Sequence, residues 1–454
     1  MTPSALFIPA SQKAEAKVIQ RDILKLAIPS ILAGITIPLV GMADTAISGR
    51  LGSASHIAAV ALGSTMFDWL YWNLSFLRTG TSGLSAQAFG KNDFRHAVRL
   101  FTQSMLLALG LSIIILLIQK PFAKLFFVIT PTSAETMQLA LQYFMIRVWA
   151  APAALSLFSI RGWFLGMQNS IGPMIIEIVV NAVNIFASFY LALHLQMGVA
   201  GIALGTVIAQ YSGLLCSFIL WWIYFRQYRQ LFSLKEAFNW QELKSFFSIN
   251  ANLFLRSFCI LLIYSGFNML AARFGDTELA VASIMMKLLL LYSYFIDGFA
   301  YAGEALVGRF IGERNAKSLR LCIKLLFYWC IFIGLVSTVV YVVADQWMLR
   351  IITSVKSVLD ACQAFVPWLY VMPFISCIAF TWDGIFIGAT ASTALRNAMF
   401  YSVAAFYLSY VCLNPFIGFQ SLWFAYAAHL VARSLAMSFY SRKHIYGRIE
   451  KAEN

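Results

Sequence analysis

Long runs of apolar residues, separated by short polar segments, follow one another along almost the whole chain. A run of about 20 apolar residues is long enough to cross the hydrocarbon core of a bilayer as a helix. The breaks between the runs predict twelve membrane-spanning helices. They cover residues 23–48, 57–82, 98–118, 137–160, 172–193, 198–225, 246–272, 279–304, 319–343, 361–387, 396–416 and 419–440.

The two halves of this pattern repeat each other. An offset of 222 residues pairs Gly90 with Gly312, and a Gly-x-Phe-x-Gly motif at 162–166 with the same motif at 384–388. Each half has six spans, an even number, so both halves cross the membrane in the same direction. The sequence therefore predicts an all-α integral membrane protein of two six-helix bundles related by a pseudo-two-fold axis along the membrane normal. Parallel repeats of this kind are typical of alternating-access transporters.

The same pattern divides the chain into five predicted parts. They are a cytoplasmic N-terminal segment (1–22), a first lobe of six helices (23–225), a cytoplasmic linker (226–245), a second lobe of six helices (246–440) and a cytoplasmic tail (441–454).

Composition supports the membrane class. The chain is 61% hydrophobic and only 11% charged, whereas soluble domains are roughly half apolar and a quarter charged. The net charge of +14 could indicate a nucleic-acid partner, but the basic residues are spread over short loops and form no basic domain. They gather in alternate loops, which by the positive-inside rule predicts a multi-pass protein of the cell (inner) membrane with both termini in the cytoplasm.

Asp44 is the most informative single residue. It lies near the end of the first apolar run, which has no other charge after Lys25. A carboxylate inside a span costs a few kcal/mol unless it is protonated or paired, and it usually marks a proton, ion or substrate path. The alternative is a carboxylate at the lipid–water boundary, satisfied by headgroups or by Arg50. Pro29, in the same run, can bend the helix or serve packing alone.

A polar stripe lies on the predicted helix 172–193. Glu177, Asn181, Asn184 and Ser188 follow one another at spacings of four, three and four residues, which places them on one helical face. We expect this face to point into the lobe or towards water, where Asn184 and Ser188 can hydrogen-bond Asp44. Hydrogen bonding between helices without a functional role is the alternative.

Four further charges lie inside predicted spans. Asp68 and Arg147 lie at similar depth and can form an ion pair, and Arg256 and Asp297 can do the same in the second lobe. Isolated charges would be costly at that depth, so structural pairing is expected. The histidines and cysteines form no ligand cluster, and no metal site is predicted.

Several motifs resemble those of multidrug and toxic compound extrusion (MATE) transporters. Pro29, the span ending Ala43-Asp44-Thr45 and the segment 48–52 (Ser-Gly-Arg-Leu-Gly) are similar to the opening of that family. The segment 85–93 resembles its helix 2–3 motif, and 382–390 is similar to the DinF-type branch. The resemblance covers nearly the whole chain. It implies outward antiport of amphipathic organic compounds against H⁺ or Na⁺ without ATP, with Asp44 as the proton-coupling residue.

The chain departs from the family pattern in two places that bear on the coupling ion. Relatives often carry Asp at the position of Ser188, and sodium-coupled relatives tend to carry acidic residues in helices 7 and 10. In this chain the seventh predicted span (246–272) offers Arg256 instead, and the tenth (361–387) has only Asp383, near its end. We therefore expect H⁺ rather than Na⁺, no cofactor, and a monomer embedded in the lipid bilayer that exports small amphipathic, cationic molecules.

Other functions fit the sequence less well. A lipid-linked precursor flippase of related architecture would use cavity cations such as Arg147, Arg256 and Lys287 to bind pyrophosphate, and it stays the main alternative. A major-facilitator transporter would have a different helix 2–3 loop from segment 90–95. No hydrolase, metalloprotease or prenyl-diphosphate motif suggests an enzyme, and no repeated filter loop suggests a channel.

Overall fold

The computed structural model describes residues 13–353 and 355–447. Within these ranges the regular secondary structure is entirely helical, which confirms the predicted all-α class. The first part of the chain contains α1 (Lys13–Gly49), α2 (Ala54–Tyr71), η3 (Asn73–Ser75), α3 (Phe76–Gly90), α4 (Phe94–Ile129), α5 (Ala134–Arg147), η4 (Val148–Ala150), α6 (Ala151–Gly166), α7 (Ile171–Phe189), η5 (Tyr190–His194) and α8 (Gly198–Phe225).

The remaining elements begin with two short helices in the predicted linker. The list is η6 (Arg226–Leu231), α9 (Leu234–Ala237), α10 (Trp240–Ala271), α11 (Asp276–Gly312), α12 (Ala316–Ile352), α13 (Lys356–Gln363), α14 (Val366–Gly388), α15 (Ser392–Ile417), α16 (Gln420–Ser441) and η7 (Arg442–Tyr446). The predicted tail beyond residue 447 lies outside the described residues.

Ten helices in the described part of the chain are long and apolar enough to cross a membrane, and they correspond to ten of the twelve predicted spans. The predicted span 57–82 corresponds to α2 and α3, which η3 separates. The predicted span 419–440 corresponds to α16, whose buried His429 and Arg433 make it less apolar.

Several helices begin earlier or end later than predicted. The predicted N-terminal segment is helical from Lys13 onward, because Ala16, Ile19 and Ile23 bury one apolar face of α1 although most of the residues between them are polar. An amphipathic helix of this kind escapes a search for continuous apolar runs.

The internal repeat is visible in the backbone. Asn92 and Arg314 both have a positive φ (56° and 55°), and so do Gln168 and Thr390 (62° and 52°). Each pair is separated by the 222 residues of the sequence repeat. The next residue after Asn92 or Arg314, which is Asp93 or Asn315, caps the helix that follows, α4 or α12: its side chain accepts a hydrogen bond from the backbone N–H three residues later.

The repeat is visible in the packing as well. A Cβ atom added to Gly162 would lie 2.2 Å from the carbonyl oxygen of Arg78, and one added to Gly384 would lie 2.1 Å from that of Ala300. Residues 78 and 300 are again repeat partners. The glycines of the Gly-x-Phe-x-Gly motif therefore let a helix backbone approach closely in each half.

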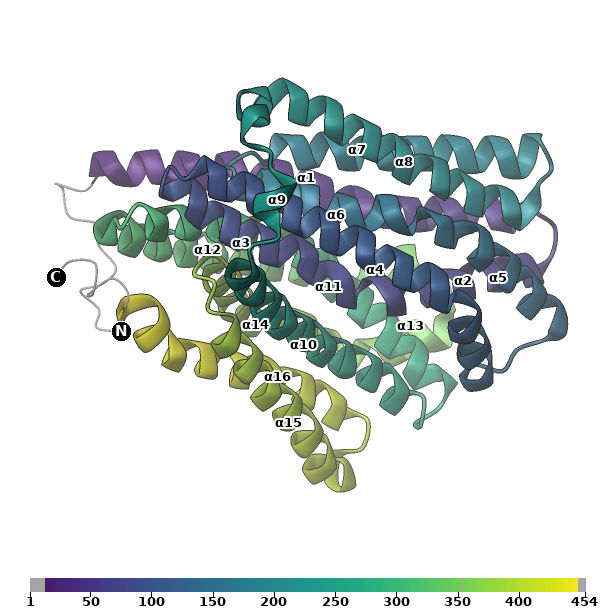
Figure 1. Cartoon of the computed structure of the whole chain (residues 1–454). Coiled ribbons are helices and arrows are strands. Elements are labelled where there is room, and N and C mark those ends of the chain that lie inside the picture. The colour runs from purple at the N-terminus through teal and green to yellow at the C-terminus, as the bar shows by residue number, and fades with distance from the viewer. Residues whose placement is uncertain (1–12, 354, 448–454) are drawn as a thin grey trace. The chain divides into compact units, whose positions relative to one another are not determined.

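The chain forms two compact units. Among the described residues, one contains 13–31, 86–91, 248–353 and 355–447, and the other contains 32–85 and 92–247. The first part of α1 and the end of α3, predicted in the first lobe, group with most of the predicted second lobe, and the predicted linker groups with most of the predicted first lobe. Within the second of these units α7 lies along α8, and within the first α15 lies along α16 (Figure 1).

Candidate functional site

Asp44 lies on the second part of α1, in the unit formed by 32–85 and 92–247. It is only 8% exposed, and its Oδ1 is buried without a hydrogen-bond partner among the described residues. The cation that acts on it electrostatically is Arg147 of α5. Arg50, the cation of the alternative interpretation, is not the one that acts on Asp44.

Arg147 is held by neighbours other than the predicted Asp68. Its Nη1 donates to the Tyr143 hydroxyl (2.6 Å) and lies 3.4 Å from Ser64 Oγ. Its guanidinium carbon is 4.6 Å from the centre of the Phe67 ring, within the range of a cation–π interaction. No ion pair within 4 Å joins it to Asp68, whose side chain is exposed.

The predicted ion pair is replaced by local contacts for a geometric reason. Tyr143 lies one turn before Arg147 on α5, so its hydroxyl can reach the guanidinium. Asp68 still acts electrostatically with Arg147 at longer range. Arg147 therefore supplies positive charge to two carboxylates, Asp44 and Asp68, without a close ion pair to either.

The amide and hydroxyl groups of the predicted stripe bind two other helices, α1 and α8. Asn181 Nδ2 donates to Thr36 Oγ1 of α1 (2.6 Å), and Asn184 Nδ2 donates to Thr206 Oγ1 of α8 (3.0 Å). Ser188 Oγ donates to the Ile202 carbonyl of α8 (3.3 Å). The expectation that Asn184 and Ser188 hydrogen-bond Asp44 is wrong, because both face α8.

Glu177, the fourth residue of the stripe, forms an ion pair with Arg161 of α6. Its Oε2 lies 2.5 Å from Arg161 Nη1, and the two side chains are only 13% and 18% exposed. Arg161 lies just beyond the predicted span 137–160. In the structure it lies inside α6, so this pair joins α6 to α7.

A second cluster of buried charges lies in the other unit. Arg256 of α10 and Arg433 of α16 both contact Oδ2 of Asp383 on α14. Asp297 of α11 acts electrostatically on Arg433. Arg256 therefore forms an ion pair with Asp383, whereas the sequence predicted a pair with Asp297. Asp383, which was expected near a helix end, is only 5% exposed.

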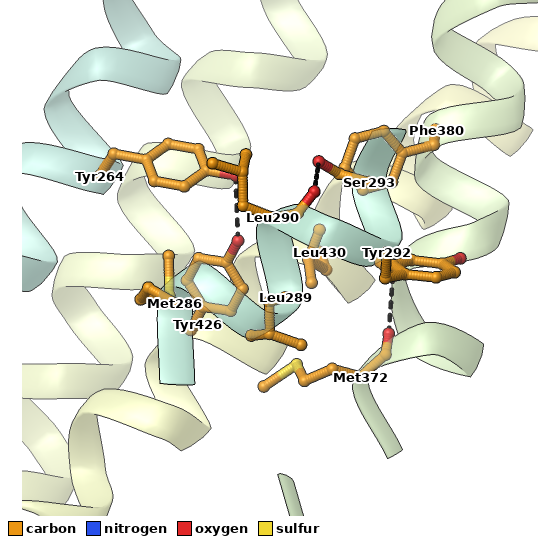
Figure 2. Close-up of a pocket in the computed structure, with 11 residues that line it drawn as sticks. Tyr264, Met286, Leu289, Leu290, Tyr292, Ser293, Met372, Phe380, Tyr426 and Leu430 are labelled. Atoms are coloured by element: carbon orange, nitrogen blue, oxygen red, sulfur yellow. Dashed lines mark hydrogen bonds between the residues drawn. The ribbon is translucent and has the colours of Figure 1, made fainter. Parts of the chain in front are cut away.

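A small cavity adjoins this second cluster. Its lining includes Tyr264, Met286, Ser293, Phe380 and Tyr426 (Figure 2), and the guanidinium carbon of Arg433 lies 5.9 Å from the centre of the Phe380 ring. The Tyr426 hydroxyl donates to that of Tyr264 across 3.3 Å. The volume is about 20 Å³, which suffices for a water molecule but not for an organic substrate.

Pro29 lies within α1, which stays helical on both sides of it. The change from one compact unit to the other occurs two residues later, between Ile31 and Leu32. A proline at this place removes one intrahelical hydrogen bond just before the helix changes unit.

Sequence reasoning missed several functional candidates. Tyr143 could have been found from its i, i+4 spacing to Arg147, whereas Arg433 carries no local signal that it shares Asp383 with Arg256. Among the described residues no group of three or more His, Cys, Asp and Glu side chains is arranged to hold a metal ion.

Comparisons with known proteins agree with these features. The sequence matches the MatE family over residues 29–191 and 253–416. DNA damage-inducible protein F of Escherichia coli (strain K12) is 32% identical, over 97% of this chain and 96% of its own length. The probable multidrug resistance protein NorM of Idiomarina loihiensis is 21% identical, over 94% and 96%.

Solved structures share the fold. A MOP superfamily transporter from Pyrococcus furiosus superposes with a TM-score of 0.85 at 18% identity, covering 96% of this chain and 97% of that one. A MATE crystal structure in a bent conformation gives 0.84 at 16% identity, with 99% and 100% covered. The chain therefore belongs to the MatE family and is a multi-pass membrane transporter of small molecules, not an enzyme.

Proposed function

We propose that this protein is a secondary antiporter of the cell (inner) membrane. It exports amphipathic, cationic organic compounds in exchange for protons, by alternating access of its two halves, with both termini in the cytoplasm. The observation that carries this proposal is Asp44, a carboxylate on a membrane-spanning helix that is buried and whose Oδ1 accepts no hydrogen bond from the described residues.

The surroundings of Asp44 suit a single exchangeable proton. Burial in a medium of low dielectric constant disfavours the charged form of a carboxyl group, and hydrogen-bond donors would offset this. The nearby amides are bound to threonines, so they do not offer these donors. Arg147 provides positive charge at longer range, which stabilises the ionised form of Asp44 after the proton leaves.

The second unit argues for H⁺ rather than Na⁺. A sodium site needs several oxygen ligands and a negative charge that is not already neutralised. Asp383 is shared by two arginines, so the acid of helix α14 is already occupied by cations of the protein itself. The same contacts weaken the flippase alternative, because Arg256 and Arg433 are engaged with a carboxylate rather than exposed to a diphosphate.

The test is transport of a dye into inverted membrane vesicles, which is the direction of export in that orientation, with an imposed pH gradient. We expect Asp44→Asn to abolish active efflux while expression and thermal stability stay close to the wild type. Asp360→Asn is the matched control, because Asp360 is an exposed acid of α13. Wild-type efflux by the Asp44→Asn variant would refute the role of Asp44.

A further inference from the structure

The ends of α3 and α11 cross with almost no side chain between them. A Cβ atom added to Gly90 would lie 2.0 Å from the carbonyl oxygen of Arg309, and one added to Gly312 would lie 2.3 Å from that of Gln87. Cβ atoms essentially never come within 3.0 Å of another heavy atom, so this crossing requires glycine at both positions. Residues 86–91 belong to the same compact unit as 248–353 and 355–447, so the contact is internal to that unit.

The contact maps onto itself under the internal repeat. The offset of 222 residues that pairs Gly90 with Gly312 also pairs Gln87 with Arg309. Each glycine therefore meets the carbonyl group of the residue three positions before the other glycine, a reciprocal arrangement like that on the two-fold axis of a symmetric dimer. The contacts of Gly162 and Gly384 differ, because each of these stays within its own repeat.

The helix α3 is shared between the two compact units. Residues 76–85 belong to one unit and 86–90 to the other, although the helix is unbroken. A continuous helix transmits movement as a rod, so a movement of one unit against the other must either bend α3 or release the crossing. In α1, Pro29 removes a helical hydrogen bond close to the place where that helix passes from one unit to the other. The helix α3 contains no proline.

The side chains around the crossing provide only light support. Gln87 Nε2 donates to the Gly388 carbonyl (2.9 Å) and to Thr390 Oγ1 (3.1 Å). Arg309 Nη1 lies 3.6 Å from Asp22 Oδ2, and both side chains are about one-third exposed (32% and 33%). Exposed ion pairs contribute little to stability, so the contact depends mainly on the close approach of the two backbones.

We propose that the crossing of α3 and α11 at Gly90 and Gly312 is a releasable clasp. It is formed in one conformation of the transport cycle and open in another, and the two glycines set the ratio of the two states. This inference rests on the alternating access of the proposed function. A larger side chain at either glycine keeps the backbones apart and favours the open state.

The first experiment measures the clasp without measuring transport. Spin labels are attached to Lys91→Cys and Glu313→Cys, two exposed repeat partners beside the crossing, in a Cys412→Ser background that removes the exposed native thiol. We expect Gly90→Ala and Gly312→Ala to shift the ratio of short to long label distances by about tenfold or more. Gly110→Ala is the control, because a Cβ atom there meets nothing within 4 Å.

The second experiment leaves both glycines intact and so does not depend on the folding of those variants. A reducible bifunctional thiol reagent joins the same two cysteines in proteoliposomes. We expect the cross-linked protein to lose efflux and to regain it after reduction. Full efflux while cross-linked would overturn the clasp, as would label distances that stay unchanged in both alanine variants. Wild-type efflux that does not depend on a proton gradient would instead refute the proposed function. The label distances would still show whether the crossing opens.

Discussion

The buried carboxylates of this protein differ in how they are neutralised. Asp383 Oδ2 receives two guanidinium groups, whereas Asp44 has one arginine at longer range and an Oδ1 without a donor. A carboxylate that contacts two arginines on different helices joins those helices. A carboxylate without donors can change its protonation state at lower cost, which is what a coupling residue requires.

The structural role of Asp383 predicts a loss of stability when its charge is removed. In Asp383→Asn the two buried arginines lose their shared partner, and breaking a buried ion pair in this way costs about 3–5 kcal/mol. We expect a clearly lower midpoint of thermal unfolding in detergent. Asp360→Asn, an exposed acid, serves as the control. An unfolding midpoint equal to that of the wild type would show that Asp383 does not join α10, α14 and α16.

The hydrogen bond of Asn184 gives a second prediction for a single residue. Because its amide nitrogen donates to Thr206, Asn184→Ala should lower the free energy of unfolding by about 1 kcal/mol. The pH at which efflux is half-maximal should stay unchanged, since Asp44 loses no donor. A shifted pH midpoint would indicate that Asn184 acts on Asp44 after all.

At the scale of helices, the contact between α7 and α8 is set by a glycine. A Cβ atom added to Gly205 would lie 2.5 Å from both the backbone nitrogen and Oγ of Ser188. Gly205→Ala should therefore destabilise the protein by about 1–3 kcal/mol through overpacking. Gly110→Ala, which adds the same methyl group in open space, should be close to neutral. Equal unfolding midpoints for the two variants would contradict this packing.

The short helix α9 is attached to the start of α4 by contacts that depend on pH. Arg95 hydrogen-bonds Glu236, and this bond holds the pKa of the Glu236 carboxyl below its ordinary value of 4.5. A lowered pKa means that the contact stabilises the folded state above pH 4.5 and is lost as the pH falls through the folded-state pKa. Gln103 Nε2 also donates to the Ala237 carbonyl (3.1 Å).

Hydrogen exchange of residues 234–237 can measure this attachment. We expect the protection of α9, corrected for intrinsic exchange, to fall as the pH is lowered below about 4.5. In Glu236→Gln the protection should be lower at neutral pH and independent of acidification in that range. Protection in the wild type that does not change with pH would remove Glu236 from this role.

The sequence predicted the helices better than their contacts. Ten of the twelve predicted spans recur as long apolar helices, because a continuous apolar run is sufficient to indicate a membrane span. The start of α1 escaped because its apolar residues are spaced on one face. The partners of Asn181 and Asn184 could not be predicted, since they depend on which helices are neighbours in space rather than in the chain.

At the scale of the whole molecule, the repeat links sequence, backbone and packing. The same offset relates the capped helix starts of α4 and α12, the close glycine contacts of the two halves, and the reciprocal crossing at Gly90 and Gly312. The two halves share this frame but differ in charge. One holds Asp44, where we place the proposed proton exchange, and the other holds Asp383 between two arginines.

The most direct test of this account is efflux from proteoliposomes in which all Na⁺ is replaced by choline and a pH gradient is imposed. We predict that the wild type expels an amphipathic cationic dye under these conditions, that dissipating the pH gradient stops it, and that Asp44→Asn shows no gradient-driven efflux. Efflux that appears only when Na⁺ is restored, or that persists in Asp44→Asn, would contradict proton exchange at Asp44.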